Sequence, residues 1–569
     1  MEELKRVAED PQIAYFSMEI GLTDEIRTFS GGLGILAGDT LKSAAELNLP
    51  MVAVTLASRK GFFVQHLDSE GRQTEEPDEW GLEEKLQLHP QKVLVRIEGR
   101  DVAIRAWFYK VGCPVTGWKV PIFYLDTNLP ENDERDRGLT DCLYGGDERY
   151  RLCQEIILGI GGVLMLRAIG FRIKKYHMNE GHAAFLTVEL LRRFKRDIES
   201  VWDEKEVWDV ERVKDLCVFT THTPVEAGHD RFSYDLVKSV LGERLPLDIL
   251  KGLAGKDNLN MTLLAMNLSN YINGVAKKHG EVSRDLFPGY EINAITNGVH
   301  SHTWTSKSFA RLYDRYLPGW ANEPELFVRV DKVPSGELWD AHMEAKRELI
   351  DYVNEKTGAG MDPDTLTIGF ARRATAYKRA NMLFSDVERL KRIGEGRLQI
   401  IYAGKSHPSD GGGKAIIEEI FKKMKELKGS IKVVFLENYN IALAKKMVSG
   451  VDVWLNTPMR PREASGTSGM KASHNGVLNF SVLDGWWIEG HIEGKTGWSI
   501  GPGPSESAVS DGASDVEDLY TKLEKEIIPV YYNNRDLWVS MMENAIGKIA
   551  YYFNTHRMMR RYVTEAYIR

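Results

Sequence analysis

The sequence predicts an α/β protein with two doubly wound lobes of mostly parallel strands, which face one another across a cleft. Three observations lead to this fold class. Short apolar runs rich in β-branched residues recur along the chain, with amphipathic helical patterns between them, as in parallel sheets. At 569 residues the chain exceeds one ordinary domain of about 150 residues. Polar, glycine-rich segments follow several runs, which is where such sheets hold ligands.

The composition fits a globular protein and excludes several other classes. Hydrophobic residues make up 43% and charged residues 27%, which argues against a disordered chain or a collagen-like repeat. The net charge of −8 argues against a nucleic-acid-binding protein. The longest apolar run, Ile156–Leu166, is shorter than the roughly 20 residues that cross a bilayer. We therefore expect a buried helix there and no membrane span.

The first residues and the cysteines favour a cytoplasmic protein. No apolar stretch follows Met1–Arg6, so we expect no secretory signal. The four cysteines are scattered and form no C-x-x-C pair, which favours reduced, structural thiols. Glutamine is scarce while glutamate and lysine are abundant, a composition that suggests a heat-adapted source.

The first lobe is expected over residues 1–300. Glu98 and Gly99 separate two apolar runs and predict a hairpin insertion over Val93–Val111. The strands predicted for this lobe are Ile13–Met18, Met51–Leu56, Val93–Ile97, Val102–Phe108, Val120–Leu125, Leu216–Thr220 and Ile292–Thr296.

The second lobe is expected over residues 301–569. Its predicted strands are Leu366–Phe370, Leu398–Ala403, Ile431–Leu436, Val451–Leu455 and Val477–Val482. Its predicted helices include Leu338–Glu355, Ile416–Leu427 and Ile441–Val448. Asp515–Arg569 reads as helices rich in Tyr and Met, and we expect the last of them to pack back on the first lobe.

A glycine-rich segment, Ser30–Gly38, precedes the helical pattern Asp39–Leu47. Glycines before a helix let backbone N–H groups approach an anion, and the helix dipole favours negative charge there. The alternative is a tight loop that needs glycine only for its backbone geometry.

A cationic segment, Phe370–Arg379, directly follows a predicted strand and contains Arg372, Arg373, Lys378 and Arg379. Arginine can grip phosphate through two parallel hydrogen bonds, and lysine can add a point charge. A solvated basic face is the alternative, but the position at the end of an apolar strand favours a ligand site.

A third segment, Arg462–Gly476, places the small residues Ser465–Gly469 at the expected start of a helix, with Lys471 just beyond them. Exposed N–H groups at such a start form an anion cradle. Lys471 can then be a phosphate ligand, or it can form a Schiff base with a phosphorylated aldehyde cofactor. An exposed lysine without such a role is the third reading.

These segments together resemble the α-glucan phosphorylases, which are the glycogen, starch and maltodextrin phosphorylases. Glu463–Lys471, followed by Asn475-Gly476 and Leu483–Gly485, resembles their pyridoxal-phosphate site, and Arg372–Arg379 resembles their phosphate-binding segment. Further similar segments, in the same order along the chain, are Gly31–Gly34, Thr221–Pro224, Thr296–Gly298 and Glu437–Tyr439.

The resemblance implies a glycosyltransferase-B fold and the reversible phosphorolysis of α-1,4-glucans to α-glucose-1-phosphate. The family reaction retains the anomeric configuration, with the cofactor's phosphate as a proton relay. Retaining hydrolases use two carboxyl groups about 5–5.5 Å apart, and the motif residues contain no such pair. The resemblance also implies a homodimer or a higher homo-oligomer, glucan and phosphate as partners, and no metal.

The resemblance assigns roles residue by residue. Lys471 would hold pyridoxal 5′-phosphate, and Arg373 and Lys378 would bind the substrate phosphate, with His222 as a further catalytic residue. The residues implied around the cofactor are Thr467, Ser468, Gly469, Arg372, Tyr439 and Gly32. Those implied for the transferred glucose and its phosphate are Glu463, Ser465, Gly466, Tyr377, Asn297, His222 and Leu33.

The chain departs from the larger relatives at several positions. They have Gly-Asn at Ser468-Gly469, Lys-Arg at Arg372-Arg373 and His at Thr375, so the contact made at Thr375 is open. The chain is also shorter, and we expect no regulatory extension and no control by phosphorylation or nucleotides.

Two rival functions stay open from the sequence. A glucan synthase that uses a nucleotide sugar shares the glycine loops and basic clamps but needs no lysine placed like Lys471. A glucan-binding protein without activity would not need Lys471, Arg373 and Lys378 together. His177–His182 lacks the H-E-x-x-H zinc pattern, and we expect it to line the sugar cleft near His222.

Overall fold

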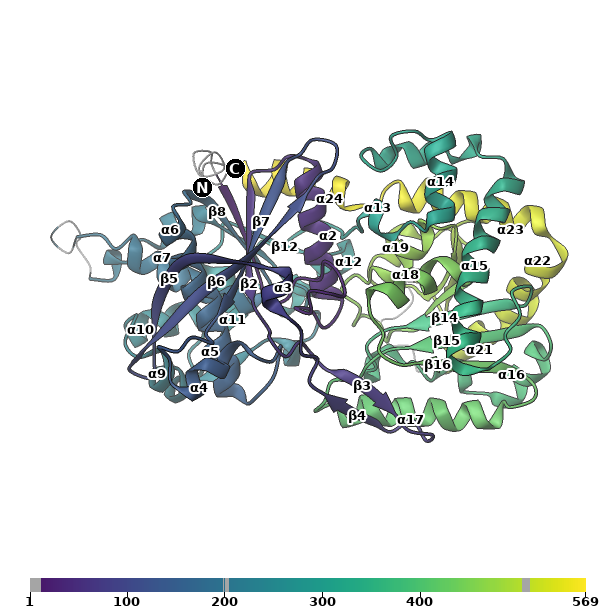
Figure 1. Cartoon of the computed structure of the whole chain (residues 1–569), viewed down its shortest axis with the longest axis horizontal. Helices are drawn as coiled ribbons and strands as arrows, with labels where there is room; N and C mark the ends of the chain where they lie inside the picture. Colours follow the sequence, from purple (N-terminus) through teal and green to yellow (C-terminus); the bar gives the residue numbers. More distant parts are fainter. Residues whose placement is uncertain (1–11, 198, 200–203, 504–511, 569) are drawn as a thin grey trace.

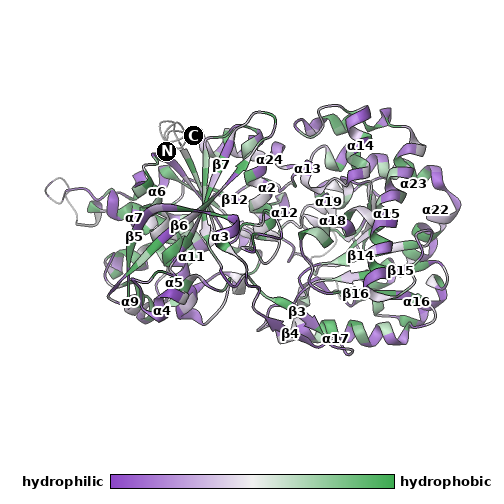
Figure 2. Ribbon diagram, viewed as in Figure 1, coloured by the Kyte–Doolittle hydropathy of each residue, from purple (hydrophilic) through white to green (hydrophobic). Residues whose placement is uncertain are grey.

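The computed structural model describes residues 12–197, 199, 204–503 and 512–568, and its mixed α/β architecture contains two large sheets of mostly parallel strands. In Figure 1 the two sheets lie in separate halves of the molecule, with helices around each. Figure 2 shows that the outer helices carry both hydrophilic and hydrophobic residues, as helices packed on a sheet do.

The first sheet has, within the described residues, nine strands in the order β13-β12-β9-β8-β1-β2-β7-β6-β5. All neighbours are parallel except β7-β6 and β6-β5. The strands are β1 (Gln12–Ser17), β2 (Met51–Leu56), β5 (Gln87–Ile97), β6 (Arg100–Gly112), β7 (Lys119–Asp126), β8 (Ile173–Asn179), β9 (Cys217–Thr220), β12 (Tyr271–Gly274) and β13 (Asn293–Ala294).

Most strand predictions for this sheet are confirmed, but Ile292–Thr296 is shorter than predicted, and β8 and β12 were not predicted. The run Ile292–Thr296 pairs as a strand only over β13; beyond it, Ile295 donates to the carbonyl of Gly274, the last residue of β12, and Asn297 donates to that of Val275. Strand β8 lacked an apolar pattern in the sequence because Lys174 and Lys175 interrupt it.

The predicted hairpin is confirmed, but it forms the edge of the first sheet and not a separate insertion. Strands β5 and β6 pair directly across Glu98 and Gly99, whose φ angles are 51° and 77°. Two successive positive φ angles are the signature of the tight turn that suits the twist of a hairpin.

The second sheet is wholly parallel, and in the described part of the chain its six strands run in the order β16-β15-β14-β17-β18-β19. The strands are β14 (Leu366–Ala371), β15 (Leu398–Ala403), β16 (Lys432–Leu436), β17 (Val453–Asn456), β18 (Leu478–Val482) and β19 (Gly497–Ile500). Helices α15 (Ser335–Thr357), α17 (Gly411–Glu426) and α18 (Ile441–Gly450) extend the predicted helices by a few residues.

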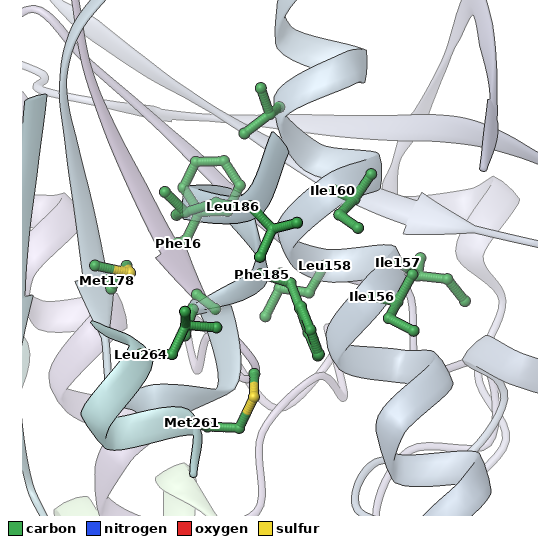
Figure 3. Close-up of a cluster of buried hydrophobic side chains, with 14 of the residues drawn as sticks. Phe16, Ile156, Ile157, Leu158, Ile160, Met178, Phe185, Leu186, Met261 and Leu264 are labelled. Carbon is green, nitrogen blue, oxygen red and sulfur yellow. The ribbon is translucent and has the colours of Figure 1, made fainter. Parts of the chain in front are cut away.

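A long buried helix crosses the first half of the molecule. It runs through α5 (Glu148–Ile156), a π-helical stretch η2 (Ile157–Gly161) and α6 (Gly162–Ile169). Figure 3 shows Ile156–Leu158 and Ile160 near Phe185 and Leu186 in the core. A Cβ at Gly159 would lie 2.6 Å from the backbone nitrogen of Leu186, so glycine allows this close packing.

This helix is longer than the apolar run alone suggested. Among the described residues, Glu148–Ile169 is the one stretch that is long and apolar enough to cross a membrane, and 78% of its most apolar window is buried inside the protein. Core helices of globular proteins meet the same criteria of length and composition, and the burial observed here fits that role.

The last described helices return to the first sheet. Helix α24 (Thr555–Tyr562) packs against α2 (Gly32–Glu46), and its Met558 and Met559 share a core cluster with Leu41. The hydroxyl groups of Thr555 and Ser43 lie 2.6 Å apart. Figure 1 shows this yellow segment beside α2. The division of the chain at residue 300 stays a prediction.

Candidate active site

Two cations converge on one carboxylate oxygen after strand β14. Arg372 Nη2 lies 2.6 Å from Glu463 Oε2, and Lys378 Nζ lies 3.3 Å from the same oxygen. Burial alone would raise the pKa of Glu463, but the charges of Arg372 and Lys378 lower it to about 2. The backbone N–H of Glu463 donates to Asp484 Oδ2 at 2.9 Å, which fixes the start of this loop. The group is suited to hold one negatively charged oxygen between two cations.

Of the other two cations of this segment, Arg379 Nη2 pairs with Asp515 Oδ2 at 2.7 Å, and Arg373 lies apart from Glu463. Arg373 is exposed, and its guanidinium has no hydrogen bond or ion pair with any residue that the structure describes. Its charge adds to burial in lowering the pKa of His407, so it lies near that imidazole. The ring centroid of Tyr377 lies 4.6 Å from Lys378 Nζ. Arg373 is therefore free to meet an anion from solution, while Lys378 is held in place.

Lys471 lies on α19 (Ser468–Ser473) in a nearly closed environment. It is 7% exposed, and its Nζ sits 4.1 Å from the centroid of the Trp304 ring. Burial lowers its pKa to about 8, although the nearby charge of Asp39 opposes this. Trp304 Nε1 donates to Asp39 Oδ2 at 2.7 Å. A lysine amine with this pKa is partly neutral near pH 7 and can act as a nucleophile.

The start of α19 is shaped by small residues. Gly466 has a φ of 75°, and the Ser468 hydroxyl accepts a hydrogen bond from Trp454 Nε1 at 2.9 Å. A Cβ at Gly469 would lie 2.1 Å from Asn479 Oδ1 and 2.8 Å from the Trp486 ring. Packing thus accounts for glycine at position 469.

Tyr439 lies three residues past the end of β16 and is half-buried. Burial raises the pKa of its hydroxyl, and the charge of Arg372 opposes this rise, so the phenol lies near that guanidinium. Tyr439 also packs against the cluster that contains Met470, next to Lys471 in sequence. The structure therefore brings the ends of β14, β16 and the α19 loop together.

The glycine segment folds differently from the prediction. Helix α2 begins at Gly32 and not at Asp39, so Gly34 and Gly38 lie inside it. A Cβ at Gly38 would lie 1.9 Å from the carbonyl oxygen of Gly21, and one at Gly34 would lie 2.7 Å from Glu19 Oε2. Nothing lies within 4 Å of a Cβ at Gly31 or Gly32. The inner glycines allow close packing, while the outer two face open space.

Glu19 is a candidate site residue that the sequence reasoning missed. It is 3% exposed, and its Oε2 accepts hydrogen bonds from the backbone N–H groups of Ser30 (2.6 Å) and Gly31 (3.1 Å). The Tyr144 hydroxyl donates to its Oε1 at 2.9 Å. The signal for it was available, because Glu19 follows β1 at the carboxyl end of a parallel strand.

His222 belongs to a second polar group, at the carboxyl ends of β8 and β9. Its Nε2 lies 2.6 Å from Asn179 Oδ1, and its backbone N–H donates to Glu180 Oε2 at 2.7 Å. Glu180 has a φ of 76°, an uncommon conformation for glutamate that these bonds help to hold. Burial lowers the pKa values of His222 and His182 to about 3, so both imidazoles are neutral at pH 7.

Several buried polar atoms around these groups lack a protein partner. They are Asn297 Oδ1, His182 Nδ1, Thr221 Oγ1 and Thr375 Oγ1. Buried polar atoms are rarely left unsatisfied, so atoms of this kind gathered near strand ends favour a polar ligand. Asn297 is 4% exposed and held by its backbone, since its carbonyl accepts from Arg557 Nη2 at 3.0 Å.

The predicted site residues therefore fall into separate groups. Arg372, Lys378 and Glu463 are in direct contact, whereas Lys471 contacts Trp304, and His222 contacts Asn179 and Glu180. Thr467, Ser465 and Gly466 lie on the loop before α19, and Gly32 and Leu33 form the first turn of α2. Trp304 and Asp39 were missed, because nothing in their local sequence indicates a contact with Lys471.

Comparisons with known proteins were made on the whole chain. A family model described as carbohydrate phosphorylase matches residues 247–497. The chain is 41% identical to the maltodextrin phosphorylase of Thermococcus litoralis, over 98% of this chain and 70% of that protein. It is 35% identical to the glycogen phosphorylase of Aquifex aeolicus, over 98% and 86% of the two chains. An uncharacterized protein of Methanocaldococcus jannaschii is 33% identical over 97% and 99% of the two chains.

Proposed function

Because the chain belongs to the carbohydrate phosphorylase family, we propose that it catalyses the reversible phosphorolysis of α-1,4-glucans such as maltodextrin, starch and glycogen. Phosphate cleaves the terminal bond at the non-reducing end and leaves as α-glucose-1-phosphate, with retention of configuration. The observation that carries this proposal is the convergence of Arg372 and Lys378 on one carboxylate oxygen of Glu463, which is a ready site for a phosphate oxygen.

The proposed architecture is the glycosyltransferase-B type, with the reaction between the two sheets. Two observations support it. Both sheets are mostly parallel, and the candidate site residues follow strands β8 and β9 in the first and β14, β16 and β17 in the second. Open parallel sheets bind ligands at these ends.

The residues around Lys471 fit pyridoxal 5′-phosphate. The buried amine, with its pKa of about 8, is suited to bond an aldehyde. Arg372 and the N–H groups at the start of α19, from Thr467 to Gly469, are suited to its phosphate, with Tyr439 close by. Gly32 leaves open space on the side of α2. When bound, the cofactor supplies a phosphate that relays a proton beside the substrate phosphate.

The residues of the chain supply the positioning and the charge. Two phosphate groups in contact repel strongly in a site that excludes water. Arg373 and Lys378 offset this repulsion for the substrate phosphate, and the first turn of α2, with Gly32 and Leu33, adds N–H groups without an intrahelical acceptor. A phosphate oxygen that takes the place of Glu463 Oε2 at Lys378 leaves the Glu463 carboxylate free to accept a sugar hydroxyl.

The substrate phosphate then acts as both acid and nucleophile. It donates a proton to the glycosidic oxygen, the bond from that oxygen to the anomeric carbon breaks, and a phosphate oxygen bonds to the same face of that carbon. No carboxylate nucleophile is needed, and the Glu463 carboxylate, which lies between Arg372 and Lys378 in the structure, serves instead to accept a sugar hydroxyl.

Apart from the Glu463 carboxylate, the transferred glucose is placed against neutral groups. His222 is neutral at pH 7, and Asn297 has an unpartnered buried oxygen. Ser465, Gly466 and Tyr377 complete the set on the side of the second sheet. Neutral donors and acceptors suit sugar hydroxyls, because they bind them without leaving an unpaired buried charge.

The direct test is release of glucose-1-phosphate. Purified protein loaded with pyridoxal phosphate is incubated with maltoheptaose and inorganic phosphate, and glucose-1-phosphate is measured by a coupled assay. We expect product that depends on both substrates. Absence of product, or transfer of glucose from a nucleotide sugar instead, would contradict the proposal. Borohydride reduction and peptide mapping should label Lys471.

Assembly and compartment are proposed from the family resemblance and from the cysteines. We expect a homodimer or higher homo-oligomer in the cytoplasm, because the family resemblance implies it and the four cysteines are unpaired in the described structure. Light scattering after size-exclusion chromatography measures the assembly directly.

A further inference from the structure

A hairpin that follows β2 in the sequence lies against the other half of the molecule. It consists of β3 (Val64–Leu67) and β4 (Gln73–Glu76), and we refer to residues 64–76 as the strap. Figure 1 shows the strap beside α17, which covers the second sheet. A Cβ at Gly71, in its turn, would lie 2.5 Å from the Phe421 ring on α17, so the two are in close contact.

Two buried glutamines join the strap to the loop after β15. Gln73 Nε2 donates to the carbonyl of Ser406 at 2.9 Å, and its Oε1 accepts from the backbone N–H of Ser406 at 3.0 Å. Gln65 Nε2 donates to the carbonyl of Gly404 at 3.0 Å and to Gln73 Oε1 at 2.9 Å. Gln65 is fully buried and Gln73 is 7% exposed. The amides thus satisfy the backbone of this loop as a neighbouring strand would.

Gln65 also holds the residue before Tyr439. Its backbone N–H donates to Asn438 Oδ1 at 2.7 Å, and its carbonyl accepts from Asn438 Nδ2 at 2.8 Å. The backbone N–H of Asn438 donates to Gln65 Oε1 at 3.1 Å. Asn438 has a φ of 55°, a conformation that asparagine tolerates better than most residues. The strap therefore fixes the turn that presents Tyr439.

The far side of the same loop holds the phosphate-binding segment. Arg372 N–H donates to the carbonyl of Ala403 at 3.2 Å, and Ala374 N–H donates to the carbonyl of Lys405 at 3.0 Å. A Cβ at Gly404 would lie 1.9 Å from the carbonyl oxygen of Arg372, so the two backbones are in direct contact. Residues 403–406 are thus sandwiched between the strap and Arg372–Ala374.

We propose that Gln65 and Gln73 are positioning residues for phosphate binding. Their amides hold residues 404–406, and through them the backbone of Arg372–Ala374, in the position that aims Arg373 at the substrate phosphate and Arg372 at the phosphate of the cofactor. Truncating either amide leaves buried backbone groups of Gly404 or Ser406 without partners, and the loop must shift to satisfy them. The inference rests on the proposed function, because it concerns the phosphate site of that reaction.

The first test separates phosphate binding from glucan binding in the full-length, cofactor-loaded protein. For Gln73→Ala we expect KM for phosphate to rise about tenfold, as small displacements of binding groups do, while KM for maltoheptaose stays within about twofold. The matched control is Glu70→Gln on the same strap, whose ion pair with Lys425 is half-exposed and should change neither constant. An unchanged KM for phosphate in Gln73→Ala, at an unchanged Tm, would overturn the proposal.

The second test does not depend on activity. Hydrogen exchange of the peptide that covers residues 369–379 is measured in the wild type, Gln65→Ala, Gln73→Ala and Glu70→Gln. We expect faster exchange at the amides of Arg372 and Ala374 in the two glutamine variants only. Equal exchange in all four proteins contradicts the positioning role, even if the wild type makes glucose-1-phosphate. If the wild type makes none, the proposed function fails, and faster exchange in the glutamine variants still supports the mechanical link.

Discussion

The candidate site residues at the carboxyl ends of the strands differ in charge between the two sheets. At the edge of the second sheet, Arg372 and Lys378 hold the ionised Glu463, whose pKa they lower to about 2. At the edge of the first sheet, His182 and His222 are kept neutral by burial, with pKa values of about 3. Both sheets are mostly parallel, so the contrast comes from the side chains and not from the architecture.

Under the proposed function, this difference lets one site serve a phosphate and a sugar. Burying a charged group costs free energy unless the group is paired. Cations therefore suit the part of the site where an anionic ligand binds. Neutral imidazole and amide groups satisfy hydroxyls without that cost. Lys471 lies between these cases, because its buried amine, with a pKa of about 8, changes charge near neutral pH.

The largest expected effect is at Lys471. Lys471→Ala should lose covalent cofactor binding and lower kcat by about a thousandfold or more, because the buried amine is the group that bonds the aldehyde. Cofactor absorbance after gel filtration and the rate of glucose-1-phosphate release measure both effects. Lys525→Ala, at an exposed lysine, is the control. Retained activity in Lys471→Ala would contradict the assignment.

The next effect tests the cationic edge. Lys378→Ala should lower kcat/KM for phosphate by about a hundredfold to a thousandfold, as the loss of one preorganised charge does. Arg373→Ala should weaken phosphate binding as well, but should leave the free energy of unfolding within about 0.5 kcal/mol, because its side chain is exposed. Steady-state kinetics and urea unfolding give the two quantities. If Lys378→Ala or Arg373→Ala changed only KM for glucan, the proposed contrast between the two sheets would be contradicted.

A smaller effect is expected at the neutral edge. His222→Gln should lower kcat/KM for maltoheptaose by about tenfold to a hundredfold, because one hydrogen-bonding group near the sugar is altered. Because its pKa is about 3, the His222 imidazole stays neutral as the pH falls from 8 to 5. Its protonation should therefore not change the reaction rate over this pH range. A pH profile measured for both proteins is decisive: an acidic limb that disappears in His222→Gln would show that this histidine becomes charged.

The smallest effect concerns pH and cofactor loading. Lys471 is protonated below its pKa of about 8, so the neutral fraction should fall about tenfold for each pH unit below that value. The rate constant for binding of pyridoxal phosphate to the apoprotein, followed by stopped-flow absorbance, should therefore rise up to about pH 8 and then level off. A rate that keeps rising to pH 10 would indicate an ordinary, exposed amine.

Much of the fold could be predicted from apolar runs, because buried parallel strands are continuous and β-branched. Strand β8 escaped this reasoning, since Lys174 and Lys175 lie on a strand whose second half is buried. The predicted start of α2, at Asp39, was wrong for a related reason. Glycine disfavours helices in isolation, but the close approach of Gly21 and Glu19 to the helix requires Gly38 and Gly34 inside it.

The candidate site was predicted unevenly. Arg372, Lys378 and Glu463 stand out as charges after strands or next to small residues, and the structure joins them. Trp304, which contacts Lys471, and Asp39, which accepts a hydrogen bond from Trp304, lie far from Lys471 in sequence and follow no local pattern. The contacts of Gln65 and Gln73 could not be predicted from the sequence either. A glutamine in a short hairpin is usually exposed, whereas these two are buried.

The sequence by itself determined the class of fold, the chemistry of the cationic and glycine-rich segments, and the family, because these depend on local patterns and on residue identity. Only the tertiary structure decided which charges pair, which histidines are neutral, which lysine has a lowered pKa, and which hairpin holds the loop beside Arg372–Ala374. Those properties depend on burial and on contacts between residues hundreds of positions apart, as Gln65 and Asn438 show. Chain folding creates both, and no single segment contains them.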